Sequence, residues 1–293
     1  MSEIAYSVFR PAKEVKGAVA IVHGMAEHRK RYVGFAEYLA GRGYGVVTYD
    51  LPGHGESTDD TKGYFGKDGV NTLIDSVSGA IERSKQEFPG TTTILMGHSM
   101  GTMVSRCWIQ NHDGEIDALI LSGAPNWQSA GKMGISLGKV LRIFKGEKGL
   151  SPLMDSMVTG NFNKTIKDPE TPVDWLSYNK ENVKKYIEDP DCGFGFTIQG
   201  YIDELTLMGQ MHDVARFRVS KPALPIRFIA GEEDPCIGGV NGLEDSIGTL
   251  KKAGYTEITS RLYPHMRHET LNETDHQTVF SDIADWLDEV TAQ

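Results

Sequence analysis

The chain has 293 residues, of which 39% are hydrophobic and 24% charged, and its formal net charge is −10 at pH 7. This length fits one large α/β domain with room for an insertion, and the acidic charge disfavours nucleic acid as the main partner, because phosphate binding needs a basic surface. No apolar run approaches the roughly 18 residues of a membrane span, and residues 1–10 lack the basic and then apolar pattern of a signal peptide. Three widely spaced cysteines, Cys107, Cys192 and Cys236, lack metal-ligand spacing and favour free thiols. We therefore expect a cytoplasmic protein.

Short apolar runs alternate with helical patterns along most of the chain, which is typical of a mainly parallel sheet covered by helices. From the N-terminus, an antiparallel edge strand could form at 4–9. The buried strands are predicted at 18–22, 45–49, 92–96, 118–121, 226–230 and 258–262. The helices are predicted at 32–41, 70–88, 99–111, 242–253 and 278–292.

The alternation stops between Pro125 and about Lys221, in a stretch that has no strand signals. Such an interruption indicates a helical subdomain inserted between two strands of the sheet. We therefore predict a core made of residues 1–124 and 222–293, with residues 125–221 forming a cap.

The pentapeptide Gly97-His98-Ser99-Met100-Gly101 directly follows the apolar run 94–96. A G-x-S-x-G pattern in this position predicts a nucleophile elbow, a sharp strand-to-helix turn that exposes the serine hydroxyl. The two glycines leave room where a side chain would press on the turn. Because a serine hydroxyl is a weak nucleophile without a base, the motif must be completed by a base, an orienting acid and an oxyanion hole.

The acid is sought after Ser99, because the chain order in this type of site is Ser, then Asp or Glu, then His. Asp234 follows the strand predicted at 226–230, at the edge where open α/β sheets place their sites. Glu232 and Glu233 compete with it, but Pro235 fixes the turn directly after Asp234, which makes Asp234 the preferred candidate.

Two histidines after the last predicted strand, His265 and His268, fit the position of the base. We favour His268, which begins the segment leading to the C-terminal helix and has Glu269 beside it as a further acceptor. We expect His265 to be an exposed loop residue.

The oxyanion hole requires two backbone N–H groups directed at the developing negative oxygen. One candidate is the amide of Met100, directly after the nucleophile. The other is the amide of Met25, which follows a His-Gly pair at the end of the first buried strand. The turn at 50–57 (Asp-Leu-Pro-Gly-His-Gly-Glu-Ser) carries too few ligands for a metal site and is interpreted as a structural loop near the active site.

Taken together, these motifs resemble the α/β-hydrolase fold, and within it the monoacylglycerol lipase and lysophospholipase group of serine aminopeptidase-like hydrolases. The matching segments lie in the same order as in that group: His23-Gly24-Met25-Ala26-Glu27-His28 with Arg31-Tyr32, residues 50–57, residues 97–101, Gly231-Glu232-Glu233-Asp234-Pro235 and Arg267-His268-Glu269. The resemblance implies Ser99 as nucleophile, His268 as base and Asp234 as its orienting acid, with the amides of Met25 and Met100 as oxyanion donors. Cys236 departs from the small aliphatic residue expected there, and either packs in the core or is a site of modification that slows the enzyme.

The reaction that this resemblance implies is hydrolysis of a carboxylic ester, monoacylglycerol-like, lysophospholipid-like or another acyl ester, through an acyl-enzyme. It requires no metal and no organic cofactor. One alternative is an aminopeptidase of the proline iminopeptidase type, in which Asp203 and Glu204 beside Tyr201 would bind a free α-amine, although we expect these acids to be exposed. A second alternative is a ligand-binding protein that keeps the fold without turnover.

The predicted cap contains apolar and aromatic residues that could line a substrate pocket. Trp127, Phe194 and Tyr201 are the named candidates for substrate binding. The remaining candidates are Phe162, Trp175, Phe196, Leu205 and Met208.

A stripe of apolar residues recurs at helical spacing in the first part of the cap. It consists of Met133, Leu137, Val140, Leu141 and Phe144, and the same stretch has an excess of lysine and arginine. Such a helix either packs on the core with its lysines solvated or makes transient contact with an anionic membrane surface.

Overall fold

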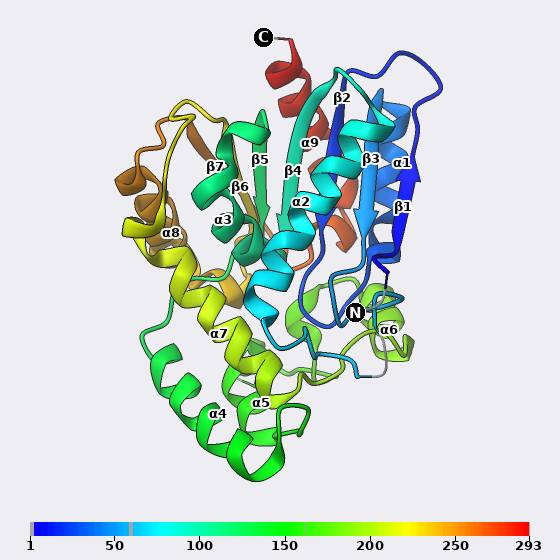
Figure 1. Cartoon of the computed structure of the whole chain (residues 1–293). Helices are drawn as coiled ribbons and strands as arrows, with labels where there is room; N and C mark the ends of the chain where they lie inside the picture. Colours follow the sequence, from blue (N-terminus) through cyan, green and yellow to red (C-terminus); the bar gives the residue numbers. More distant parts are fainter. Residues whose placement is uncertain (1–2, 59–60, 161, 293) are drawn as a thin grey trace.

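The computed structural model describes residues 3–58, 61–160 and 162–292. Its centre is a seven-stranded sheet with the strand order β1-β3-β2-β4-β5-β6-β7 (Figure 1). β1 runs antiparallel to β3, whereas each other pair of neighbouring strands is parallel. The strands are β1 (Tyr6–Phe9), β2 (Gly17–Val22), β3 (Tyr44–Tyr49), β4 (Thr92–His98), β5 (Ala118–Ser122), β6 (Ile226–Gly231) and β7 (Ile258–Tyr263).

Helices cover both faces of the sheet. The helices are α1 (Val33–Gly41), α2 (Gly69–Glu87), α3 (Met100–His112), α4 (Gly131–Lys145), α5 (Pro152–Val158), α6 (Lys180–Glu188), α7 (Ile198–His212), α8 (Gly239–Ala253) and α9 (His276–Thr291). One apolar cluster joins α1 and α9 to the sheet, and a second joins α2, α3, α7 and α8 to it. β2, β3 and β5 are buried along their whole length, because helices lie on both sides of them.

The α/β fold predicted from the alternating pattern is confirmed. The strand at 4–9 forms as β1 and pairs antiparallel with β3 at the edge of the sheet. The predicted strands differ from the observed ones by at most two residues at either end. Among the described residues, no helix has the length and apolar character needed to cross a bilayer.

The segment between β5 and β6 holds α4, α5, α6 and α7. In Figure 1, α4, α5 and α7 lie together at one end of the sheet. α4 approaches α7 through two glycines: a Cβ added at Gly134 would lie 2.7 Å from Leu205, and one added at Gly138 would lie 2.7 Å from Ile202. This arrangement agrees with an inserted cap, while its division from the core at residues 125 and 221 stays a prediction.

The apolar stripe of α4 faces largely outward. Met133, Val140 and Phe144 are 67%, 52% and 82% exposed, and Ile143 beside them is 79% exposed. Leu141 differs from them and packs partly buried against the core. The helix thus contacts α7 through its glycine face, which leaves an apolar surface in solvent. We call this surface the α4 patch (Met133, Val140, Ile143 and Phe144).

Candidate active site

Ser99 sits in the turn between β4 and α3 with a φ of +50° and a ψ of −121°. A non-glycine residue pays energy for this conformation, and such strain is concentrated at functional sites. The two glycines of the motif allow the turn to form. A Cβ added at Gly101 would lie 2.2 Å from the Val22 carbonyl oxygen, and one added at Gly97 would lie 2.6 Å from the Gly101 carbonyl oxygen. The close packing of this turn therefore explains why glycine flanks the serine on both sides.

His268 and Asp234 form a buried hydrogen-bonded pair. The distance from His268 Nδ1 to Asp234 Oδ2 is 2.9 Å, and both residues are 2% exposed. The other carboxylate oxygen, Oδ1, accepts a hydrogen bond from the backbone N–H of Cys236 at 2.8 Å. Gly123 at the end of β5 leaves space for the pair, because a Cβ there would lie 3.0 Å from the imidazole ring.

The carboxylate of Asp234 controls the charge of the imidazole. Burial alone would lower the pKa of His268, but the charge of Asp234 and its hydrogen bond outweigh burial and raise that pKa above its ordinary value. His98 lies nearby, with its ring centroid 4.8 Å from that of His268. Burial, and then the neighbouring His268, lower the pKa of His98 to about 4. Of these two histidines, His268 is therefore the one that can exchange a proton near neutral pH.

Ser99 and His268 open onto the same cavity, which has a volume of about 560 Å³. Met25 and Met100 also line it. Among the described residues, no hydrogen bond joins the Ser99 hydroxyl to His268, and the amides of Met25 and Met100 donate to no other group. Hydrogen bonds of this kind are often long in unliganded enzymes and shorten only with substrate.

The loop after β2 is held by Glu27, whose carboxylate is buried. Glu27 Oε1 accepts hydrogen bonds from the Gly24 N–H at 2.6 Å and from the Tyr32 hydroxyl at 2.7 Å. Glu27 Oε2 pairs with Arg31 at 2.9 Å. Burial alone would raise the pKa of Glu27, but the charge of Arg31 outweighs it and the pKa falls to about 2. A permanent carboxylate thus fixes the turn that contains Met25.

Glu269 is placed differently from the prediction that it accepts a hydrogen bond from His268. Its two oxygens bind the guanidinium of Arg31 at 2.5 and 2.7 Å, and Oε2 also accepts from Asn182 of α6 at 2.6 Å. Arg31 is the stronger partner because its planar guanidinium binds a carboxylate at two points. Glu269 therefore links the loop of the base to α6 and to Arg31.

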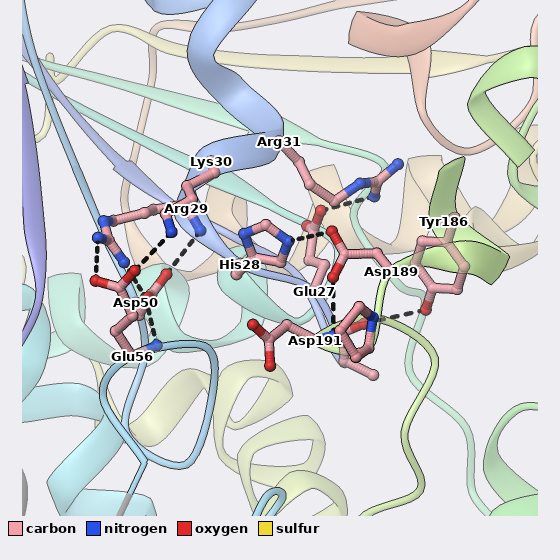
Figure 2. Close-up of polar contacts among 12 residues, drawn as sticks. Glu27, His28, Arg29, Lys30, Arg31, Asp50, Glu56, Tyr186, Asp189 and Asp191 are labelled. Atoms are coloured by element: carbon pink, nitrogen blue, oxygen red, sulfur yellow. Dashed lines mark hydrogen bonds and ion pairs between the residues drawn. The ribbon is translucent and has the colours of Figure 1, made fainter. Parts of the chain in front are cut away.

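Polar contacts also connect the loop after β2 to the end of α6, as Figure 2 shows. The His28 ring contacts the Asp189 carboxylate at 3.0 Å. The carbonyl oxygen of Ala26 accepts two hydrogen bonds, one from the Tyr186 hydroxyl at 3.2 Å and one from the Gly193 N–H at 2.9 Å. The cap and the Met25 loop thus share direct bonds.

The turn at 50–57 is built around the buried Asp50. This carboxylate accepts hydrogen bonds from the backbone N–H groups of Arg29 and Glu56, both at 2.8 Å, and pairs with the Arg29 guanidinium (Figure 2). His54 is also buried, and its Nδ1 contacts the Pro52 carbonyl oxygen at 3.1 Å. These contacts agree with the interpretation of the turn as a structural loop.

Of the three residues predicted to bind substrate, Phe194 lines the cavity, whereas Trp127 and Tyr201 are not among the described residues that line it. Trp127 instead stacks on His212, with ring centroids 4.7 Å apart. Tyr201 is fully buried and donates its hydroxyl hydrogen to Asp155. Both rings are used in internal packing, and a role for them in substrate binding stays a prediction. The other cap residues named from the sequence that line the cavity are Phe162, Trp175, Leu205 and Met208.

The expectation that Asp203 and Glu204 are exposed was also wrong, because they are only 4% and 5% exposed. The two side chains face different surroundings. Asp203 faces the start of α2, where a Cβ added at Gly69 would lie 2.1 Å from its Oδ2, while Glu204 lines the cavity. Helical neighbours point about 100° apart, so the pair cannot act on one ligand as suggested.

Cys236 is buried and forms part of the cavity wall. Burial, and then the charges of Asp234 and Glu204, raise the pKa of its thiol well above the ordinary value. A thiol in this state is a poor nucleophile, which favours packing over modification. His265 is 93% exposed in its side chain, as expected.

The sequence pattern assigned no role to Glu27, Arg31 or Asp155, and did not place Trp175 next to His268, although the structure puts all four at or near the site. The Trp175 ring centroid lies 4.9 Å from that of His268, and Asp155 lines the cavity. Glu27 and Arg31 belong to one of the motifs quoted above, and their spacing of four residues is a signal for an ion pair on a helical turn. Asp155 had no comparable local signal.

Comparison with known proteins agrees with this geometry. The model of the serine aminopeptidase S33 family matches residues 13–275. A monoacylglycerol lipase of Mycolicibacterium smegmatis is 25% identical over 97% of this chain and 92% of its own, and the human monoglyceride lipase is 25% identical over 97% and 86%. The structure of a carboxyl esterase from Bacillus coagulans superposes with a TM-score of 0.88 at 24% identity, covering 98% of this chain and 94% of the other. The protein therefore belongs to the serine aminopeptidase S33 family, within the α/β-hydrolase fold.

Proposed function

We propose that this protein hydrolyses carboxylic esters, with Ser99 as the nucleophile, His268 as the general base and Asp234 as the acid that orients His268. One observation carries the proposal: the strained Ser99 opens onto the same cavity as His268, whose ring is hydrogen-bonded to Asp234. The amides of Met25 and Met100 lie on the same wall and donate to no other group within the part of the chain that the structure describes, which supports the proposal.

In this mechanism Asp234 accepts the Nδ1–H of His268, which leaves Nε2 free to take the proton from the Ser99 hydroxyl. The Ser99 oxygen attacks the ester carbonyl carbon, and the amides of Met25 and Met100 stabilise the negative oxygen of the tetrahedral intermediate. His268 then gives its proton to the leaving alcohol as the C–O bond breaks. A water molecule repeats the cycle on the acyl-enzyme, which releases the carboxylic acid and restores Ser99.

The test is the variant Ser99→Ala, assayed on p-nitrophenyl esters beside the exposed control Ser136→Ala. We expect Ser99→Ala to lose about 10³-fold or more in rate, because the triad acts as a unit, and Ser136→Ala to keep the wild-type rate. A fluorophosphonate probe should label the wild type and the control but not Ser99→Ala. Near-normal turnover by Ser99→Ala would refute the mechanism, and a folded wild type that the probe fails to label would favour the ligand-binding alternative.

We propose monoacylglycerol-like esters as the preferred substrates. The cavity wall is rich in methionine and other apolar side chains, which suits an acyl chain. Among the described residues that line the cavity there is no lysine or arginine, so a phosphate-bearing lysophospholipid would find no cation near Ser99. The relatives named monoacylglycerol lipase and monoglyceride lipase support the same choice.

The second candidate is an aminopeptidase of the proline iminopeptidase type. The observation that favours it is that α5 and α7 each place a carboxyl group, Asp155 and Glu204, on the cavity wall, where a free amine could bind. The two candidates are separated by comparing proline p-nitroanilide with short-chain p-nitrophenyl esters. Hydrolysis of the anilide without hydrolysis of the esters would make the aminopeptidase the preferred function.

We also propose that the cap touches a lipid surface through the α4 patch. Contiguous exposed apolar side chains are unusual on a protein surface and mark contact sites. Lys132, Lys139 and Lys145 of the same helix are exposed and would attract anionic headgroups. Such contact would bring the cavity close to an ester that is dissolved in a membrane.

A further inference from the structure

The carboxyl group of Glu204 on α7 is buried without compensation. Glu204 is only 5% exposed, and its Oε2 atom has no hydrogen-bond partner among the described residues. Buried polar groups in folded proteins are almost always paired, and an unpaired one costs stability. The unpaired carboxyl group of Glu204 lies on a cavity wall and therefore requires an explanation. A ligand in the cavity that supplies the missing hydrogen-bond partner would provide one.

The other carboxyl groups on the cavity wall are already paired. Glu27 and Glu269 bind Arg31, and Asp155 accepts the hydroxyl hydrogen of Tyr201. Glu204 alone among these four has no donor directed at it in the described part of the chain. Since neither lysine nor arginine lines the cavity there, a molecule bound in the cavity, rather than a cationic side chain, would supply the partner of Glu204.

Glu204 lines the same cavity as Ser99, His268 and Cys236. Its charge is among the causes that raise the pKa of Cys236, after burial and the charge of Asp234. The Cys236 sulfur in turn lies within 4.8 Å of a ligand atom of both Asp234 and His268. A substrate held at Ser99 would therefore pass near this carboxyl group.

The protonation of Glu204 defines what it can bind. Burial, and then the charge of Asp155, raise its pKa to about 8. Near neutral pH the group is therefore mostly a carboxylic acid, which both donates and accepts a hydrogen bond. A hydroxyl satisfies such a group without charge transfer, whereas an ammonium group would bind its ionised form.

We propose that Glu204 is a specificity-determining residue, which accepts a hydrogen bond from a donor group on the substrate, a hydroxyl or an ammonium. Together with Asp155 it forms a polar subsite (Asp155 and Glu204) in an otherwise apolar cavity. The inference rests on the proposed ester hydrolysis at Ser99, because the subsite is assigned to the substrate of that reaction.

The experiment compares two matched pairs of esters. The first pair is glycerol octanoate against propyl octanoate, which differ in hydroxyl groups. The second pair is propyl 2-aminooctanoate against propyl octanoate, which differ in an ammonium group. For each enzyme the ratio of kcat/KM within a pair is measured on one preparation, so the ratio does not depend on the fraction of the protein that is folded and active.

Three variants report on the carboxyl group. We expect Glu204→Leu to lower the ratio of one pair about tenfold, the value of one net hydrogen bond, and Glu204→Ala to lower the same ratio if the leucine variant folds poorly. Glu204→Gln distinguishes the donor: it keeps the ratio for a hydroxyl, because its amide also donates and accepts, and loses the ratio for an ammonium. The control Asp203→Asn, equally buried on the same helix but facing α2, should keep both wild-type ratios.

The inference is overturned if Glu204→Leu and Glu204→Ala keep both ratios while they still hydrolyse p-nitrophenyl octanoate. It is also overturned if Asp203→Asn changes the ratios as much as the Glu204 variants do. Failure of the proposed function has a different signature, since then the wild type itself would hydrolyse none of the esters and would not react with the fluorophosphonate probe.

Discussion

The turn that contains Ser99 depends on Gly97 and Gly101, which are packed more tightly than a glycine on the surface of a helix. A methyl group at Gly101 would overlap the Val22 carbonyl oxygen of the adjacent strand, so the turn would have to move. Gly248 in α8, in contrast, has no atom within 4 Å of the position of an added Cβ. Replacement of glycine by alanine should therefore have opposite effects on the free energy of unfolding at Gly101 and at Gly248.

We expect Gly101→Ala to lower the free energy of unfolding by more than about 2 kcal/mol, because backbone atoms cannot give way as a side chain can. Gly248→Ala should instead raise it by up to about 1 kcal/mol, the difference in helix propensity. Chemical denaturation of both variants measures the change. An unaffected Gly101→Ala variant would mean that the elbow is less tightly packed than the structure indicates.

We expect the protonation of His268 to set the pH dependence of catalysis. The base must be neutral to accept the Ser99 proton, and Asp234 raises the pKa of His268 above its ordinary value. Activity is therefore expected to be lost as pH falls through this raised pKa, and the acid limb of kcat/KM should lie above about 6.5, the value of a free histidine. A pH–rate profile on an uncharged ester measures it, with Asp234→Asn as the variant that should shift the limb to lower pH. An acid limb at or below 6.5 in the wild type would contradict the assignment.

At the scale of elements, α4 shows how a helix can pack without using its apolar stripe. Gly134 and Gly138 allow close approach to α7, so contact is made by backbone and by the partner's side chains. Met133, Val140 and Phe144 of the stripe lie on the neighbouring face and are left in solvent. The periodic pattern in the sequence located the helix correctly, but a pattern of apolar residues does not reveal that glycines form the buried face.

The exposed face of α4 can be tested directly. We expect the double variant Ile143→Asp and Phe144→Asp to reduce binding to anionic vesicles at least tenfold, because burying each side chain contributes about 1.5–3 kcal/mol. Neither residue lines the cavity, so turnover of a water-soluble p-nitrophenyl ester should not change. Ile187→Asp on α6, at a residue 52% exposed, is the matched control and should bind vesicles like the wild type. Equal loss in both variants would remove the special role of the α4 patch.

At the scale of the whole molecule, the core could be predicted far better than the cap. The central strands β2, β3, β4, β5 and β6 are short, largely apolar runs, since burial on both faces leaves few polar positions. Ser99, Asp234 and His268 follow strand ends, and parallel strands bring their carboxyl ends to one edge. Local patterns were therefore enough to predict both the sheet and the residues gathered at its edge.

The cap residues of the cavity could not be predicted in this way. Trp127, Phe194 and Tyr201 are all aromatic residues in helical or irregular stretches, yet only Phe194 of these three lines the cavity. Their roles depend on how α4, α5 and α7 are placed against each other, which is decided by contacts between segments distant in sequence. The position of Glu204 on the cavity wall has the same origin, since nothing local distinguishes it from Asp203, which is equally buried but faces α2.

The two hydrogen bonds received by the Ala26 carbonyl oxygen, from Tyr186 and Gly193, have a consequence for the exchange of caps between related hydrolases. Ala26 directly follows Met25, so residues of the insertion help to hold the peptide that carries one of the proposed oxyanion donors. A chimaera with a foreign insertion would change the rate of acyl transfer as well as the choice of substrate, unless both bonds were rebuilt. We therefore expect that selectivity and the rate of catalysis cannot be changed independently by exchanging the insertion.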